Sequence, residues 1–164
     1  MITEQVVQEL KERYPGDVLD AYPYMDQWNV LLRRDRIVEI CRDLRDDPRM
    51  QFNHLADLTG VDYLPRTPRF EVVYNLYSMS FGQRLRLKVP LEESDLQVDS
   101  VFSLWRAADF LEREVFDLFG ITFRNHPNLR RIMMADDWEG HPLRKDYPGE
   151  SPEGIIRERI SVDE

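Results

Sequence analysis

Histidine and carboxylate side chains are the groups in this sequence whose spacing could support chemistry. His126 and His141 flank the acidic pair Asp136 and Asp137, and His54 stands apart from them. Imidazole nitrogen and carboxylate oxygen are ligands for zinc or manganese, so His126, His141 and Asp136 could form the metal centre of a hydrolase. The other interpretation is structural. His126 and His141 each precede a proline, as in turns, and their rings would then hydrogen-bond to backbone groups.

A second candidate is the charged run between positions 109 and 117. Glu112 and Glu114 flank Arg113 and suggest a pair of catalytic carboxylates. Residues two apart point to different faces of a helix, however, so these two carboxylates cannot act on one bond. A spacing of four links Asp109 to Arg113 and Arg113 to Asp117, which predicts an ion-pair ladder on a solvated helix face.

The motifs of common cofactor-binding and catalytic folds are missing. The sequence has no glycine-rich phosphate loop, no C-x-x-C, no H-E-x-x-H and no G-x-S-x-G. Its single cysteine, Cys41, cannot close an intrachain disulfide or hold an iron–sulfur cluster that requires four ligands. With 22 Lys and Arg against 31 Asp and Glu, the net charge of −9 repels a phosphate backbone, so no nucleic-acid partner is expected.

The spacing of apolar residues predicts the elements that would position these groups. A helix is expected over 6–14, because its apolar residues recur every three to four positions. Branched and aromatic residues predict two short strands at 18–22 and 28–32. A second helix follows over 37–44, with Asp35 as a possible N-cap.

Farther along the chain the apolar period changes to two. Extended segments are predicted at 52–61, 70–79 and 84–89. In the last of these, apolar residues alternate with basic ones, so one face should be buried and the other should face solvent or a partner. The basic row consists of Arg84, Arg86 and Lys88. This order of elements predicts an α+β fold with a mixed or mainly antiparallel sheet and helices packed on one side.

The last predicted helix begins at Ser103, its expected N-cap, and ends at Gly120. Residues 1–121 are therefore predicted to form the α+β domain, and residues 122–164 a long extended C-terminal arm. The arm region contains seven Gly and Pro residues but keeps many apolar side chains. A disordered tail seldom carries so much apolar surface, so we expect the arm to lie on its own domain or on another protein of a complex.

Three segments, at 112–123, 126–134 and 137–148, read EREVFDLFGITF, HPNLRRIMM and DWEGHPLRKDYP. They resemble the C subunit, or 30-kDa subunit, of the proton-translocating NADH:quinone oxidoreductase, respiratory complex I. The resemblance implies a cofactor-free structural subunit of the peripheral arm that braces the D subunit near the quinone-reducing module. FMN, iron–sulfur clusters, NADH and quinone would belong to partner subunits. The isolated chain should be inactive and act only within the NADH:quinone oxidoreductase complex.

The resemblance also implies a location at the cytoplasmic face of the inner membrane, held there by the complex. Direct membrane insertion is not expected, because the longest apolar run covers only 132–135, against the ~20 residues of a membrane-spanning helix. Related membrane-bound hydrogenases and other quinone-linked dehydrogenases have equivalent subunits and stand as alternatives. The separate alternative is the metal-dependent hydrolase with His126, His141 and Asp136.

The resemblance assigns no catalytic, cofactor-binding or metal-binding residue, but it marks residues of the family motif as expected interface residues between subunits. These are Glu112, Arg113, Glu114, Asp117, Gly120, His126, Pro127, Arg130, Arg131, Asp137, Trp138, Gly140, Pro142, Arg144, Lys145, Asp146, Tyr147 and Pro148. Among them, Arg144 and Asp146 are expected to act as positioning charges. Arginine does not deprotonate at physiological pH, but its planar fork can hold a carboxylate in two parallel hydrogen bonds.

Overall fold

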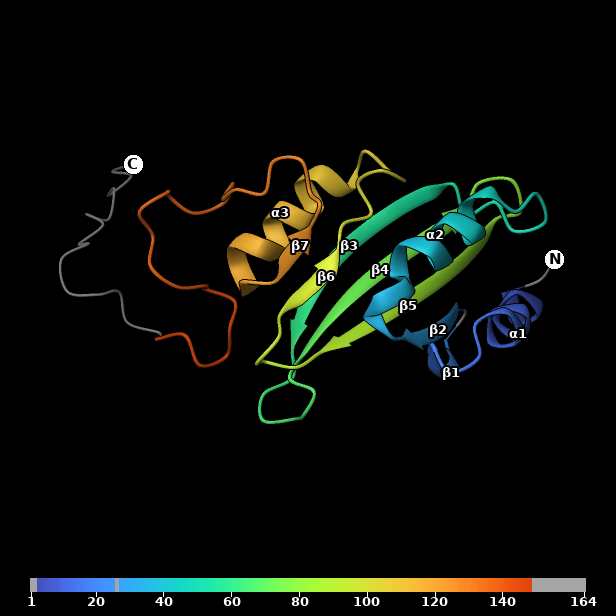
Figure 1. Cartoon of the computed structure of the whole chain (residues 1–164), viewed down its shortest axis with the longest axis horizontal. Coiled ribbons are helices and arrows are strands. Elements are labelled where there is room, and N and C mark those ends of the chain that lie inside the picture. The colour runs from blue at the N-terminus through green and yellow to red at the C-terminus, as the bar shows by residue number, and fades with distance from the viewer. Residues whose placement is uncertain (1–2, 26, 149–164) are drawn as a thin grey trace, which may run out of the picture.

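The computed structural model describes residues 3–25 and 27–148, which form helices, a large sheet and a small sheet (Figure 1). The helices are α1 (Thr3–Arg13), α2 (Ile37–Asp46) and α3 (Ala108–Phe119). The strands are β1 (Val18–Tyr24), β2 (Gln27–Leu32), β3 (His54–Asp62), β4 (Phe70–Ser78), β5 (Gln83–Leu91), β6 (Gln97–Asp99) and β7 (Thr122–Arg124). The predicted arm is described as far as residue 148, and its part from 149 to 164 lies outside the described residues.

The main sheet has five strands in the order β1-β2-β5-β4-β3. Three neighbouring pairs are antiparallel, and β2 pairs with β5 in parallel. The predicted α+β fold with a mixed, mainly antiparallel sheet is therefore confirmed. The turn between β4 and β5 closes a hairpin and includes Gly82 at φ 65°, a left-handed conformation that favours glycine.

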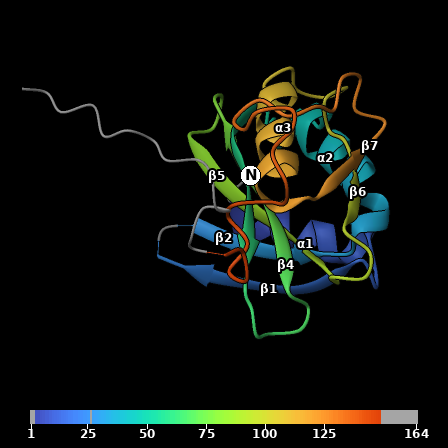
Figure 2. The same cartoon turned by 90° about the vertical axis from the view of Figure 1, so that its left-hand side faces the viewer.

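The three helices cover one face of this sheet (Figure 2). Apolar side chains of all three helices join the sheet in one buried cluster, which includes Leu10 of α1, Ile40 of α2, Val115 of α3 and Leu87 of β5. Along β5 buried residues alternate with exposed or half-buried ones, so the basic row lies on the uncovered face. This agrees with the predicted alternation, because a strand turns successive side chains to opposite faces.

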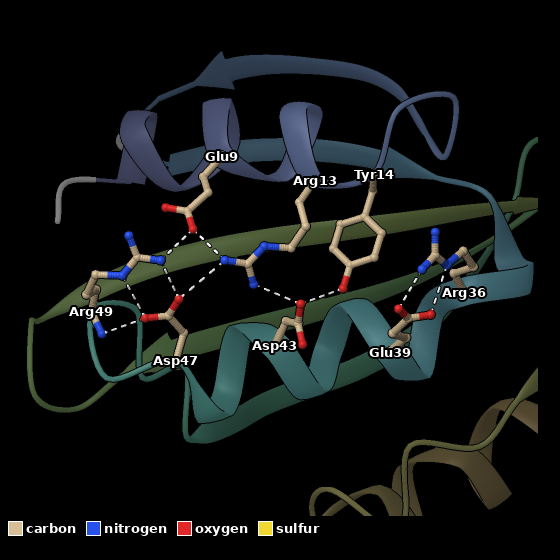
Figure 3. Close-up of polar contacts among 8 residues, drawn as sticks. All are labelled: Glu9, Arg13, Tyr14, Arg36, Glu39, Asp43, Asp47 and Arg49. Atoms are coloured by element: carbon tan, nitrogen blue, oxygen red, sulfur yellow. Dashed lines mark hydrogen bonds and ion pairs between the residues drawn. The ribbon is translucent and has the colours of Figure 1, made fainter.

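Helices α1 and α2 are joined by charged side chains at their outer rim (Figure 3). Arg13 of α1 donates to Asp43 of α2 at 2.8 Å, and Tyr14 donates to the same carboxylate at 2.6 Å. Arg49 pairs with Glu9 at 2.5 Å and with Asp47 at 2.6 Å. Exposed pairs of this kind contribute about 1 kcal/mol or less each, so the apolar cluster beneath them holds the two helices in place.

Two predicted helix caps are wrong. Asp35 does not cap α2, because a 3-10 turn at Arg34–Arg36 precedes the helix and no side chain bonds to its first N–H groups. Ser103 does not cap α3, which begins only at Ala108 after a series of turns. The predicted end of α3 is confirmed, since Gly120 adopts a left-handed conformation at φ 75°.

The small sheet pairs β6 with β7 in parallel and was not predicted. Each strand has three residues, too few to show a period of two in the sequence. The pairing brings the start of the arm beside the segment that precedes α3. The described part of the arm then runs along α3 to the end of the main sheet (Figure 1).

Candidate functional site

The family-motif residues gather where the arm lies against α3. Near the start of the helix, His126 Nε2 lies 3.2 Å from the backbone oxygen of Asp109. One turn farther, Arg113 Nε donates to the backbone oxygen of Arg130 at 3.2 Å. The arm and the helix therefore run side by side, and the chain forms this contact within itself.

Asp117 is the centre of this contact. Its side chain is fully buried, and one carboxylate oxygen accepts the backbone N–H groups of Ile132, Met133 and Met134 at 2.9, 2.7 and 3.0 Å. The other oxygen accepts Arg131 at 2.6 Å. Burial opposes ionisation of Asp117, but these four donors outweigh it and lower the pKa of the carboxyl. A carboxylate thus fixes the turn of the arm as a bound anion would.

The predicted ion-pair ladder on a solvated face of α3 is wrong. Arg113 and Asp117 are 6% and 0% exposed, and the ion pair of Asp117 is formed with Arg131 of the arm. Spacing on a helix places side chains on one face, but it does not show whether another segment covers that face. Here the arm covers it, and an arm residue replaces Arg113 as the partner.

The arm also caps the C-terminal end of α3. His141 Nδ1, the backbone N–H of Leu143 and Arg144 Nε donate to the backbone oxygens of residues 117, 118 and 119 at 2.8, 3.1 and 2.7 Å. These carbonyls have no partner inside the helix, and the helix dipole favours cations at this end. Burial lowers the pKa of His141, and the charges of Arg144 and Arg131 lower it further, although the hydrogen bond to residue 117 opposes this shift. A Cβ at Gly120 would lie 2.6 Å from both His141 and Arg144.

A second charge cluster, centred on the buried pair Arg69 and Asp62, ties the arm to the end of the main sheet. Arg69, 5% exposed, donates to Asp62 at 2.8 and 3.0 Å and to Asp146 at 2.5 and 3.0 Å. Asp62 also accepts the backbone N–H of Lys145 at 2.8 Å. The bonds from Arg69 hold the pKa of Asp62 far below its usual range, although burial opposes them. The predicted positioning charge Asp146 is therefore held by its own chain.

Arg144 uses only part of its guanidinium in hydrogen bonds within the described residues. Its Nε atom bonds to the end of α3, and the group lies 5.3 Å from the centre of the Phe70 ring, which Arg69 also contacts at 4.7 Å. A cleft of about 390 Å³ opens beside it and is lined by Arg144, Tyr147 and neighbouring arm residues. No pattern in the sequence pointed to Asp62 and Arg69, because the arm residues that they bind stand far away in the chain.

Glu112 occupies a third buried position, where a solvated face was expected. It is 0% exposed and accepts Ser100 Oγ at 2.6 Å and the backbone N–H of Val101 at 2.8 Å. Burial raises the pKa of Glu112 to about 7, although both hydrogen bonds oppose this shift. His126 Nε2 lies 3.9 Å from this carboxylate. Glu112 therefore secures the segment before α3 and lies beside the first arm histidine.

The two arm histidines do not converge on a common site. His126 contacts the backbone oxygen of residue 109 and His141 that of residue 117, a separation of about 12 Å along a helix that rises 1.5 Å per residue. His126 Nδ1 also accepts the N–H of Asn128 at 3.0 Å. Both rings thus bond to backbone groups, as the structural interpretation predicts. Within residues 3–25 and 27–148, no three His, Cys, Asp or Glu side chains are placed to hold a metal ion.

The remaining motif residues lie on or near the surface, Glu114 on α3 and the others on the arm. The exposed ones are Glu114, Pro127, Arg130, Asp137, Gly140, Lys145, Asp146 and Pro148, while Trp138, Pro142 and Tyr147 are half-buried. Tyr147 donates to the backbone oxygen of Glu139 at 3.1 Å. Large apolar side chains stand among them, with Met133 61% and Leu143 52% exposed. Contact of these residues with another protein of a complex stays a prediction, and so does the domain boundary at residue 121.

Comparisons with known proteins agree with one another. The family model described as "Respiratory-chain NADH dehydrogenase, 30 Kd subunit" matches residues 30–153. The NADH-quinone oxidoreductase C subunit of Citrifermentans bemidjiense is 49% identical over 149 residues, covering 91% of each chain. That of a Roseiflexus species is 49% identical over 143 residues, covering 87% of this chain and 82% of the relative.

Two solved structures share the fold. The trypsin-resistant fragment (1-134) of Nqo5 has a TM-score of 0.64 and 39% identity, covering 79% of this chain and all of the fragment. A chain of an archaeal membrane-bound sulfane sulfur reductase has a TM-score of 0.72 at 24% identity, covering 89% of this chain and 85% of that chain. The second likeness is one of fold alone.

Proposed function

The chain belongs to the family of the 30 Kd subunit of respiratory-chain NADH dehydrogenase, and on this basis we propose that it is a structural subunit in the peripheral arm of the proton-translocating NADH:quinone oxidoreductase. In this role it braces the D subunit near the quinone-reducing module. The arm of residues 126–148 supplies the docking surface.

The observation that carries this proposal is an irregular arm of fixed shape that exposes two large apolar side chains among its charged residues. The buried side chains of Asp117 and Arg69 hold the arm on its own domain through charged hydrogen bonds to Arg131 and Asp146. Met133 and Leu143 nevertheless point outward with more than half of each side chain exposed. Preformed loops that present apolar groups are typical of binding surfaces, since little conformational entropy is lost on docking.

Under the same proposal, this chain holds none of the redox cofactors of the complex. The chain has one cysteine, Cys41, which is buried in the apolar cluster. FMN, iron–sulfur clusters, NADH and quinone would belong to partner subunits. No helix in the described residues is long and apolar enough to cross a membrane. On the basis of the family, we propose a location at the cytoplasmic face of the inner membrane, attached through the complex.

Substitutions at the exposed apolar positions test the docking role without disturbing the fold. Met133→Asp and Leu143→Asp change side chains that are 61% and 52% exposed, so the isolated variants should unfold at the same temperature as the unchanged chain. Met79→Asp, at a 66% exposed position in the β4–β5 turn, is the matched control. Each variant replaces the native chain in cells, and the amount of assembled complex and its NADH:quinone reductase activity are measured in membranes.

We expect both arm variants to lower the amount of assembled complex, with unchanged turnover per assembled complex, and the control to assemble normally. Normal assembly of both arm variants would contradict the docking role. Normal assembly with a severely reduced turnover would contradict the structural role, because it would place the arm at the chemistry.

A further inference from the structure

The uncovered face of the main sheet has its own groove, separate from the arm. Arg84 and Arg86 of β5 line it together with Tyr77 of β4 and with His54 and Asp57 of β3, around a volume of about 410 Å³. The helices and their apolar cluster lie on the opposite face of the sheet. We call this feature the open-face groove. Neither the family motif nor the buried charge clusters include any of its residues.

Two arginines in the open-face groove have no acidic partner within the described part of the chain. Arg86 Nε donates to the neutral amide of Asn75 at 2.9 Å, and the guanidinium of Arg84 lies 6.0 Å from the centre of the Tyr77 ring. The next basic residue of the row, Lys88, does pair with Glu71 at 3.0 Å. The one carboxylate among the described lining residues, Asp57, accepts the amide of Asn75 at 3.4 Å. Two arginines therefore stand against one carboxylate, and the groove retains positive charge although the whole chain has a net charge of −9.

Elsewhere in this chain, at the rim between α1 and α2, arginines do form ion pairs with carboxylates. There, Arg13 and Arg49 both contact carboxylates (Figure 3). Beside the groove, Asn29 stands in register with Arg86 on the same face and is 2% exposed. Its amide nitrogen finds no hydrogen-bond acceptor within the described residues. A buried donor without an acceptor is unfavourable.

We propose that the open-face groove is a second interaction surface and binds an extended acidic segment of a neighbouring polypeptide. Arg84 and Arg86 point to the same side of β5 at a separation of about 6.6 Å, two residues at 3.3 Å each. Carboxylates at alternate positions of an extended segment have the same spacing, and each guanidinium can hold one in two parallel hydrogen bonds.

Neighbouring residues support a protein ligand. Tyr22 and Tyr24 of β1, the edge strand beyond β2, are 37% and 56% exposed, and tyrosine and arginine are enriched at protein interfaces. A membrane surface or a nucleic acid fits less well, because an extended polyanion would be repelled by the net charge of −9. A short acidic segment meets only the local positive charge of the groove.

Zero-length cross-linking in the assembled complex tests the proposal. Arg84→Lys and Arg86→Lys keep the charge and introduce a primary amine that a carbodiimide couples only to a carboxylate in direct contact. The matched control is Arg42→Lys, an exposed position of α2 on the helical side. We expect both groove variants to form a cross-link to an Asp or Glu of another polypeptide, located by mass spectrometry, and the control to form none at that segment.

Charge removal gives a second, independent measurement on the full chain. The double variant Arg84→Gln and Arg86→Gln should weaken association with the cross-linked partner about tenfold at low salt, and the difference should shrink at high salt. Three results would overturn the proposal: cross-links only within this chain, cross-links only to a second copy of it, or binding to phosphatidylglycerol vesicles that the double variant abolishes. None of these results bears on docking through the arm.

Discussion

Replacing Glu112 by glutamine should remove a pH dependence that this buried carboxyl imposes on the stability of the fold. Glutamine has nearly the same shape and can keep both hydrogen bonds: its oxygen can accept the N–H of Val101, and its amide can donate to Ser100. The change therefore removes the ionisable group while the packing stays the same. Asp109 and His126 are the charged or titratable neighbours nearest to it along the arm contact.

The magnitude follows from the two states of the chain. The carboxyl loses its proton near the ordinary value of 4.5 when the chain is unfolded, whereas the folded pKa is about 7. Between these values only the folded state holds the proton, so the contribution of Glu112 to stability is complete below pH 4.5 and is lost as the pH rises through 7. At 1.36 kcal/mol per pKa unit, the full effect is about 3 kcal/mol.

Urea unfolding of the isolated chain, followed by tryptophan fluorescence between pH 5 and pH 8, measures this effect. The free energy of unfolding of Glu112→Gln minus that of the unchanged chain should rise by about 2–3 kcal/mol across this range. Taking this difference cancels the contributions that the other titrating groups make to the pH dependence of the free energy of unfolding. Glu114→Gln, at an exposed position on the same helix, is the control and should give a much smaller change. A flat difference for Glu112→Gln would refute the assignment of a buried, protonated carboxyl.

Three further substitutions probe the arm contact through the free energy of unfolding in urea. Asp117→Asn should destabilise the chain by about 3–5 kcal/mol, because Arg131 then keeps a charge without its buried partner; a loss below ~1 kcal/mol would contradict the contact. Gly120→Ala should cost more than Gly16→Ala, because both sites have positive φ but only at Gly120 does the new Cβ meet the arm, at 2.6 Å; equal losses would show that the arm does not lie there. Arg69→Lys should destabilise the chain measurably, since lysine cannot form the forked bonds of arginine, and stability close to that of the unchanged chain would argue against this cluster.

The periodic parts of the fold could be predicted from the sequence, because burial on one face leaves a regular pattern. The alternation along β5 and the glycine that ends α3 are examples, and both are confirmed. The capping residues could not be predicted, since Asp35 and Ser103 have suitable side chains but the chain enters each helix through other turns. At both helix starts, tertiary contacts set the path of the chain and override the local capping preference.

Part of the contact between the arm and its own domain could be predicted from the sequence, but its arrangement could not. The proline that follows each arm histidine correctly indicated backbone hydrogen bonds. The partners of Asp117 and Arg69 lie on an irregular segment, and Arg69 and Asp146 are 77 positions apart. Residues on irregular segments so far apart in the chain show no regular spacing from which their contact could be predicted. The helical spacing of Arg113 and Asp117 therefore suggested a solvated ladder, whereas the arm covers both side chains.

A site-specific photo-cross-linker at Leu143, in the complex purified from membranes, tests the docking of the arm most directly. Leu143 is 52% exposed, and its backbone N–H is fixed to the end of α3 at 3.1 Å, so the probe reports the outer surface of an ordered arm. We expect an efficient cross-link to the D subunit, identified by mass spectrometry, and none from a probe at Met79. Efficient quenching of the probe by solvent alone, or a cross-link only within this chain, would contradict docking through the arm.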